Sequence, residues 1–170
     1  VRSIKMTFYR VARNSAAMNA LINAARNGKY VTVFMEIQAR FDEKANIYWT
    51  QRLQEEGVKV IQTIPGYKVH AKLLLVRRRE ENDENTFYAN IGTGNFNEST
   101  AKVYADDSLL TNNPDICNDI YNIFELLEAR FILPKFNTLK VAPFAIRDFF
   151  IQKLEKEIER SEEHTSELQS

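Results

Sequence analysis

The pair of side chains in this sequence best suited to chemistry is a histidine and a lysine two residues apart, His70 and Lys72. Apolar and polar residues alternate over residues 68–75, which is typical of a β-strand and would place both polar side chains on one face, about 7 Å apart. A neutral imidazole is a nucleophile at neutral pH, and a neighbouring ammonium group stabilises charge on phosphate oxygens. The pair therefore indicates phosphoryl transfer through a phosphohistidine, whereas a histidine alone would be interpreted as a hydrogen-bonded core residue.

A loop with two glycines, Gly92 and Gly94, follows farther along the chain. Glycines allow backbone N–H groups to approach an anion closely, and the side-chain amide of Asn95 would add a donor. A simple turn is the alternative interpretation of such a loop. Beyond the loop, Tyr104 is suited either to stacking on a base or to filling the core, and the sequence leaves both open.

Two arginines, Arg10 and Arg40, each follow an apolar segment that is expected to be a strand. Ligands of parallel sheets bind outside the carboxyl ends of the strands, where both guanidinium groups would emerge. Each guanidinium can bind phosphate oxygens in a bidentate manner. A surface ion pair, for instance between Arg40 and Asp42 or Glu43, is the alternative.

The elements that must position these residues follow from hydrophobic periodicity and from helix-capping and turn signals. We expect strands over residues 3–9, 30–37, 58–63, 68–75, 86–91 and 106–111, and helices over 15–26, 43–56, 113–130 and 144–159. Strands and helices alternate in the first half, which predicts parallel strands joined by right-handed crossovers. The fifth expected strand can form a hairpin with the fourth. The predicted fold class is α/β, with a mixed, largely parallel sheet flanked by helices.

Composition limits the classes of function. The chain has 170 residues with 44% hydrophobic content, enough for the core of one domain, and a formal net charge of zero. A zero net charge provides no global basic field for nucleic acid or an anionic membrane. Cys117 is the single cysteine, so an internal disulfide is excluded and a cytoplasmic location is expected. No apolar run approaches the roughly 20 residues of a membrane-spanning helix.

Both ends of the sequence carry expectations of their own. The chain begins at Val1, and we expect it to be a piece of a longer protein. Residues 160–170 resemble the translation of a common sequencing adapter, so the natural sequence is expected to stop near Glu159. Without residues 161–170 the chain keeps 23 basic and 20 acidic side chains. His164 then has no functional meaning.

Several stretches together resemble the catalytic C-terminal region of the bacterial long-chain polyphosphate kinases, a family with a phospholipase-D-like fold. The matching stretches are residues 4–12, 38–43, 65–72, 91–98, 107–111 and 141–143. The resemblance runs over residues 1–159. It implies a first phospholipase-D-like catalytic domain over 1–137 and the beginning of a second one over 138–159, with 160–170 non-native.

The resemblance also implies an activity and roles for individual residues. The family transfers the γ-phosphate of ATP reversibly to polyphosphate, with Mg²⁺, through an autophosphorylated histidine that matches His70. Its magnesium- and phosphate-associated arginines match Arg10 and Arg40, and a tyrosine implicated in ATP binding matches Tyr104. Because a guanidinium cannot ligate a cation, Mg²⁺ would be held there by phosphate oxygens or carboxylates.

Two departures from related sequences bear on function. Many family members have histidine where this chain has Asn90. Relatives that cleave lipids or nucleic acids carry an aspartate where this chain has Arg77, so its absence favours a kinase over a phosphodiesterase.

The family also has a second catalytic half with another essential histidine. We therefore expect this chain alone to be inactive, and the full-length protein to be a homo-oligomer. A phosphodiesterase or nuclease of the same fold, and a non-catalytic polyanion-binding module, remain the alternatives.

Overall fold

The computed structural model describes residues 1–37, 43–62, 68–82, 84–129 and 134–167. The chain divides into two compact units, Val1–Lys135 and Phe136–Ser170. The boundary lies two residues before the one expected from the sequence. That the second unit begins another phospholipase-D-like domain, and that residues 160–170 are non-native, stay predictions.

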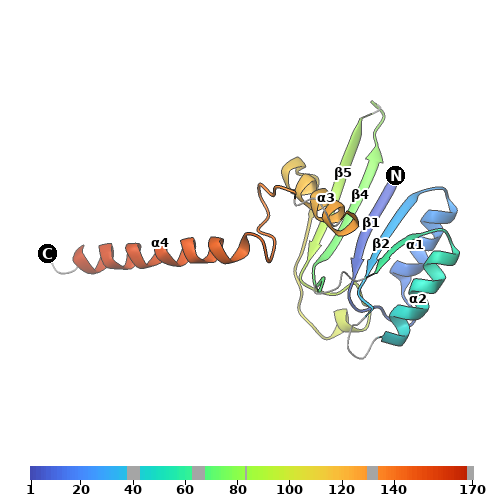
Figure 1. The fold of residues 1–170 in the computed structure, drawn as a ribbon, viewed down its shortest axis with the longest axis horizontal. Helices are drawn as coiled ribbons and strands as arrows, with labels where there is room; N and C mark the ends of the chain where they lie inside the picture. The colour runs from blue at the N-terminus through green and yellow to red at the C-terminus, as the bar shows by residue number, and fades with distance from the viewer. Residues whose placement is uncertain (38–42, 63–67, 83, 130–133, 168–170) are drawn as a thin grey trace. The chain divides into compact units, whose positions relative to one another are not determined.

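The first unit is built on a six-stranded sheet with the order β3-β2-β1-β4-β5-β6 (Figure 1). Its strands are β1 (Ser3–Phe8), β2 (Tyr30–Met35), β3 (Lys59–Gln62), β4 (Lys72–Arg79), β5 (Asn85–Gly92) and β6 (Ser108–Thr111). Its helices are α1 (Ala16–Arg26), α2 (Glu43–Glu55), the short η1 (Thr100–Lys102) and α3 (Pro114–Glu128). The α/β class, with a mixed sheet flanked by helices, is confirmed.

The parallel part of the sheet is smaller than expected. Strands β1, β2 and β3 pair in parallel, but the β1–β4, β4–β5 and β5–β6 pairings are antiparallel. The reason lies in the connections: the short turn between β4 and β5 can join only antiparallel strands, whereas parallel neighbours need a long crossover. As a result, the carboxyl end of β1 lies beside the start of β4.

Helices α1 and α2 cover one face of the sheet. As predicted, Ser15 caps α1, its Oγ accepting a hydrogen bond from Met18 N at 3.3 Å, and Gly28 follows the helix with a φ of 71°. The largest part of the core lies beneath these two helices. It contains Met6, Phe8, Val11, Met18, Leu21, Ile22, Val31, Val33, Met35, Trp49, Leu53 and Val58.

Helix α3 covers the opposite face and packs against β4 and β5 (Figure 1). The Asn113 side chain caps it, accepting hydrogen bonds from Asp115 N and Ile116 N, and Pro114 occupies its first turn. Its buried stripe includes Cys117, whose thiol contacts the carbonyl oxygen of Phe87 on β5 at 3.5 Å. Burial raises the pKa of this thiol above its ordinary value.

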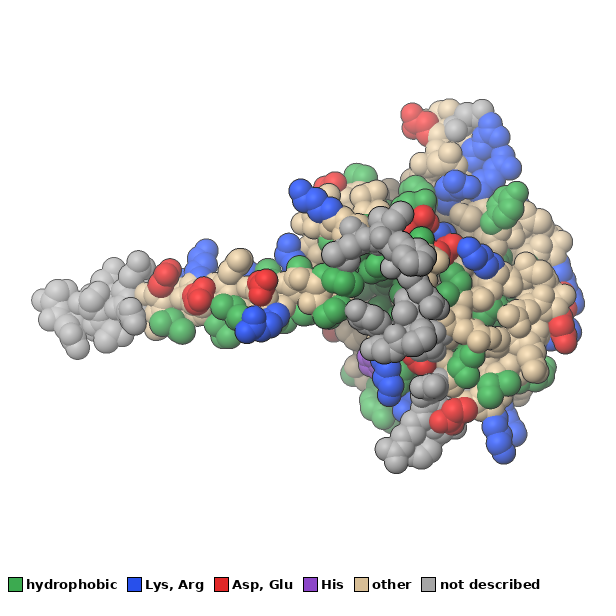
Figure 2. Space-filling model, viewed as in Figure 1, with side chains coloured by type: hydrophobic (Ala, Val, Ile, Leu, Met, Phe, Trp, Pro, Cys, Tyr) green, Lys and Arg blue, Asp and Glu red, His purple; other side chains and the backbone are tan. Residues whose placement is uncertain are grey.

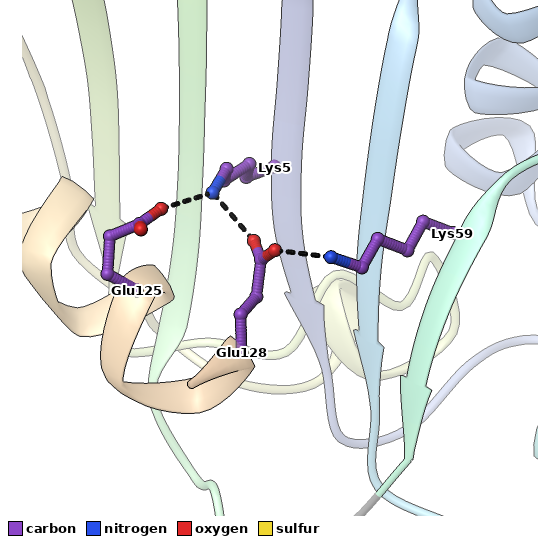
Figure 3. Close-up of polar contacts among 4 residues, drawn as sticks. All are labelled: Lys5, Lys59, Glu125 and Glu128. Carbon is purple, nitrogen blue, oxygen red and sulfur yellow. Dashed lines mark hydrogen bonds and ion pairs between the residues drawn. The ribbon is translucent and has the colours of Figure 1, made fainter. Parts of the chain in front are cut away.

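A cluster of charged side chains joins α3 to the sheet (Figure 3). Lys5 Nζ on β1 lies 3.0 Å from Glu125 and 2.6 Å from Glu128, and Lys59 Nζ on β3 lies 2.6 Å from Glu128. Burial works to raise the pKa of Glu128, but its hydrogen bonds with the two lysines outweigh burial and lower it. Burial likewise works to lower the pKa of Lys5, and its two carboxylate partners raise it overall.

The second unit contains one long helix, α4 (Ile146–Glu167). Phe150, Leu154 and Ile158 are spaced four residues apart along it and are exposed. None of the helices in the described parts of the chain is long and apolar enough to cross a membrane.

Candidate active site

The candidate active site lies at one end of the sheet, where β1 ends, β4 begins and β5 ends. Lys72, the first residue of β4, pairs with Gly92, the last residue of β5. Arg10 follows the end of β1, which is the antiparallel neighbour of β4. The fold therefore brings the predicted histidine–lysine pair, the glycine loop and Arg10 to the same edge.

His70 differs from the expectation in its backbone. It does not lie within a strand, because β4 begins only at Lys72. The reason is Thr7, whose Oγ1 accepts a hydrogen bond from Leu73 N at 2.9 Å and donates one to Ala71 O at 2.6 Å. This side chain takes the place of the next β1–β4 backbone hydrogen bonds, so the regular pairing of β1 with β4 ends at Leu74.

The two side chains nevertheless meet more closely than predicted. Lys72 bends back so that its Nζ lies 2.9 Å from Nδ1 and 3.2 Å from Nε2 of His70, and it also donates to the His70 carbonyl oxygen. Lys72 is only 5% exposed, whereas His70 is exposed. The imidazole packs edge-on against the Tyr9 ring, with centroids 4.7 Å apart. His70 is thus accessible yet held in place, and it is not a core residue.

Electrostatics at the pair favour a neutral imidazole. Partial burial, followed by the charges of Lys72 and Arg10, lowers the pKa of His70 below its ordinary value. At neutral pH the ring then keeps an unprotonated nitrogen, which a nucleophile requires. The pKa of Lys72 is also lowered, by burial, although the charge of Asp106 opposes the shift.

Asp106 is a residue that the sequence analysis missed. It accepts a hydrogen bond at 3.1 Å from the Thr93 hydroxyl of the glycine loop. Its side chain also occupies the space next to Gly94, where an added Cβ would come within 2.8 Å of Asp106 Cβ and closer still to its carboxyl group. Gly94 therefore makes room for a carboxylate beside Lys72. The acidic pair at the start of the expected strand at 106–111 was the available signal.

Asn90 and Gly92 lie on the face of the sheet that Lys72 shares, two residues apart on β5. Asn90 is 8% exposed and donates to Ser108 Oγ on β6 at 2.5 Å. Its Oδ1 is buried and has no hydrogen-bond partner among the residues that the structure describes. A buried oxygen without a hydrogen-bond donor is uncommon. A Cβ atom added to Gly92 would lie 3.8 Å from this oxygen.

The rest of the glycine loop is fixed to the core and to α1. Phe96 packs against Phe8 with ring centroids 5.8 Å apart, and Glu98 Oε1 accepts a hydrogen bond from Ala16 N at 2.7 Å in the first turn of α1. Asn95 is partly buried, and its Oδ1 has no hydrogen-bond partner within the described ranges. The loop is therefore held firmly while it presents polar atoms.

Arg10 is positioned by Asn46 on α2, another residue that the sequence did not indicate. The Asn46 side chain donates to Tyr9 O at 2.9 Å and accepts from Val11 N at 3.2 Å. Trp49 is buried and donates a hydrogen bond from Nε1 to Ala12 O at 3.0 Å. The backbone on both sides of Arg10 is thereby attached to α2.

The remaining predicted residues have different outcomes. Tyr104 follows η1 and is 67% exposed, which excludes the core-filling alternative. Arg40 lies outside the described residues. In the described part of the chain, no group of three His, Cys, Asp or Glu side chains could hold a metal ion.

A mixed α/β domain with a histidine–lysine pair beside a fixed glycine loop is the class of structure defined so far, and comparison with known proteins gives its family. Residues 1–131 match the family model for polyphosphate kinase C-terminal domain 1. This chain belongs to the polyphosphate kinase family.

Similar proteins agree with this assignment. The chain is 50% identical over 158 residues to a polyphosphate kinase of Vibrio parahaemolyticus, and 47% identical over 163 residues to one of Escherichia coli strain K12. These matches cover 93% and 96% of this chain but 23% and 24% of the relatives. The chain therefore spans about a quarter of the length of the curated relatives that it matches.

A solved structure is also similar. The crystal structure of polyphosphate kinase from Porphyromonas gingivalis matches with a TM-score of 0.82 and 38% sequence identity. The match covers 96% of this chain and 27% of that one. Both the fold and the sequence thus relate this chain to one region of a larger protein.

Proposed function

We propose that this chain supplies one part of the active site of an ATP:polyphosphate phosphotransferase, which transfers the γ-phosphate of ATP reversibly to polyphosphate through a phosphohistidine at His70. The observation that carries the proposal is the accessible imidazole of His70, whose pKa is lowered and which lies 2.9 Å from the ammonium group of Lys72. The names of the relatives give the substrate class.

The chemistry proceeds in two displacements. An unprotonated nitrogen of His70 attacks the γ-phosphorus, the bond to the bridging oxygen breaks, and ADP leaves while the ring loses its other N–H proton to solvent. The terminal oxygen of polyphosphate then attacks the phosphorus of the phosphohistidine. The N–P bond breaks, the chain is extended by one phosphate, and the ring takes up a proton from solvent to return to its starting state. Lys72 exchanges its contact with the ring for the transferred phosphate, and Arg10 binds the same group through its guanidinium fork.

The remaining residues of the site have supporting roles in this proposal. The glycine loop, with Gly92, Gly94 and Asn95, would donate to phosphate oxygens, and the exposed Tyr104 ring is free of the core and suited to stacking on adenine. Arg40 would complete the phosphate contacts. Mg²⁺ would neutralise phosphate charge, held mainly by phosphate oxygens, with Asp106 as a carboxylate near Lys72.

The relatives are about four times as long as this chain, and we infer that the reaction needs the rest of such a protein. A second catalytic half with its own histidine would complete the site. The chain alone would then be inactive, and the complete enzyme would work in the cytoplasm as a homo-oligomer.

Labelling of the full-length parent tests the proposal. Incubation with ATP labelled at the γ-phosphate should leave acid-labile, base-stable label on the protein, and His70→Ala should remove it. Arg52→Ala, which removes a cation that pairs with Glu55 and Glu56 on α2, is the control and should keep the label.

Label that persists in His70→Ala would contradict the phosphohistidine. Cleavage of a phosphodiester substrate without ATP would instead support the nuclease or phosphodiesterase alternative. Polyphosphate binding without any labelling would support a non-catalytic module.

A further inference from the structure

The opposite end of the sheet carries a shallow cavity of about 400 Å³ that the proposed reaction does not use. It is lined by Arg2, Tyr30, Arg77, Arg79 and Asn85. Arg77 and Arg79 come from the far end of β4, about 17 Å and about 23 Å along the strand from Lys72 at the usual rise per residue. Figure 2 shows Lys and Arg side chains gathered around this end of the β4–β5 hairpin, at the upper right.

The pairing of the strands explains why these side chains meet. Tyr30 on β2 and Arg77 on β4 are the two neighbours of Ser3 on β1, and Arg79 pairs with Asn85 on β5. Paired residues project from the same face, and the small Ser3 side chain between two large ones leaves a hollow. This is the face of Lys5 and α3, whereas Lys72 projects from the other face.

The backbone under the cavity is fixed. Arg2 N donates to Arg77 O at 2.8 Å, and Tyr30 N donates to Arg2 O at 3.0 Å. Hydrogen bonds thus connect three strands directly beneath the lining side chains. The strands that carry the lining side chains would therefore need no rearrangement on binding.

The composition of the lining specifies the charge of the ligand. All five lining residues carry hydrogen-bond donors, three are guanidinium groups, and none is acidic. Arg77 Nε is buried and has no hydrogen-bond partner among the described residues. A buried donor on a charged group that lacks an acceptor points to a missing anion.

We propose that this cavity is an accessory binding site for inorganic polyphosphate, distinct from the site at His70; the choice of polyphosphate among phosphate anions rests on the proposed function. Guanidinium forks match the oxygens of successive phosphates, and the Tyr30 hydroxyl and the Asn85 amide add neutral donors. Because the two sites lie at opposite ends and on opposite faces, they bind different segments of one long chain. Occupation of the accessory site then raises the local concentration of chain ends at His70.

The adjacent Arg78 provides a matched control. It lies on the same strand but projects from the other face, and its Nε pairs with Glu80 at 3.3 Å. Replacing Arg78 changes the net charge as much as replacing Arg77 does, but it leaves the cavity intact. A difference between the two variants therefore separates a defined site from a general charge effect.

The experiment measures polyphosphate affinity of the whole chain by calorimetry, with polyphosphates shorter and longer than the distance between the sites. Arg77→Gln should bind long polyphosphate several-fold more weakly, while Arg78→Gln, which removes the same single charge, changes affinity less than about twofold. The double variant Arg77→Gln/Arg79→Gln should bind about tenfold more weakly and show a smaller salt dependence. Arg77→Lys keeps the charge without the fork and should give an intermediate loss. The circular dichroism spectra of Arg77→Lys and of the double variant should match that of the parent, which would show that both variants are folded.

Several outcomes would overturn the proposal. Equal losses in Arg77→Gln and Arg78→Gln would show only a general charge effect, and unchanged affinity in the folded Arg77→Lys and double variants would exclude the site. Orthophosphate that binds as tightly as long polyphosphate would identify a site for single phosphates. A lower melting temperature of the full-length double variant with unchanged polyphosphate affinity would identify the cavity as a docking surface within the longer protein.

The two proposals fail separately. If His70 is not labelled by ATP but the double variant still loses polyphosphate affinity, the proposed reaction is wrong and the accessory site stands. If labelling depends on His70 but the cavity variants bind polyphosphate normally, the proposed reaction stands and the accessory site is wrong.

Discussion

At the scale of single residues, the reactivity of His70 depends on the cations around it. The structure attributes its lowered pKa first to burial, and then to the charges of Lys72 and Arg10. In the proposed reaction, two effects would follow from the same arrangement: the ring would stay unprotonated, and the incoming phosphate would meet positive charge. Lys72 would then both prepare the proposed nucleophile and bind the group that it attacks.

Removal of the lysine charge should raise the pKa of His70. In Lys72→Met, which keeps an apolar side chain of similar length, we expect the pKa to move up toward the ordinary histidine value, with a smaller rise in Arg10→Gln. The sequence has two histidines, so a His164→Gln background leaves one imidazole signal for titration by NMR. An unchanged pKa in Lys72→Met would show that the charge of Lys72 does not contribute to the shift.

The contact between Gly94 and Asp106 gives a second prediction. Gly94→Ala would displace the carboxylate, and Asp106→Asn would remove its charge, so each should reduce labelling of His70 in the full-length parent by about tenfold. Because both act on one group, the double variant should be little worse than either single one.

Asp107→Asn is the control for this pair of variants, since only the backbone of Asp107 bonds to Thr93. It should keep nearly full labelling. Additive losses in the Gly94→Ala/Asp106→Asn double variant would contradict a shared mechanism.

At the scale of elements, the cluster of Lys5, Glu128 and Lys59 gives stability a pH dependence. The pKa of Glu128 is lowered in the folded state, so its contribution is present above the unfolded value near 4.5 and is lost as pH falls through the folded pKa. The pKa of Lys5 is raised, so its contribution is present below 10.5 and is lost as pH rises through its folded pKa. The attachment of α3 is thus strongest between these limits.

Glu128→Gln should lower the free energy of unfolding by about 1–3 kcal/mol at pH 7, because it leaves two lysines without their shared carboxylate. The loss should shrink as the pH falls through the lowered folded pKa of Glu128, where the parent also loses this charge. Urea unfolding at several pH values measures both effects. Glu125→Gln, whose carboxylate is more exposed, should cost only about 0.5 kcal/mol, and equal costs for the two variants would contradict the assigned roles.

Local signals predicted the elements better than the contacts between them. The cap at Ser15, the turn after Arg26 and the Asn113-Pro114 helix start were identified because each depends on a few neighbouring residues. The end of the β1–β4 pairing at Thr7 was not identified, and neither was the hydrogen bond from Asn46 to Tyr9. In both cases the partner lies more than 30 residues away along the chain. For the same reason His70 was included in the expected strand, whereas β4 begins at Lys72. The prediction that His70 and Lys72 lie together was correct.

At the scale of the whole molecule, net charge was a poor guide to local fields. The formal charge of the chain is zero, yet His70 lies under the influence of two cations, and three arginines line a cavity at the far end of the sheet. Local clusters of charge, rather than the total, determine where an anion can bind. Within the run at residues 77–79, Arg78 pairs with Glu80, whereas Arg77 and Arg79 line the cavity.

The buried thiol of Cys117 has a practical consequence. It is the only cysteine of the chain, it lies at the contact between α3 and β5, and burial raises its pKa. A thiol reagent should therefore react with the native protein only when α3 lifts from the sheet. The alkylation rate therefore measures how often α3 separates from the sheet in the unaltered chain, without any introduced probe.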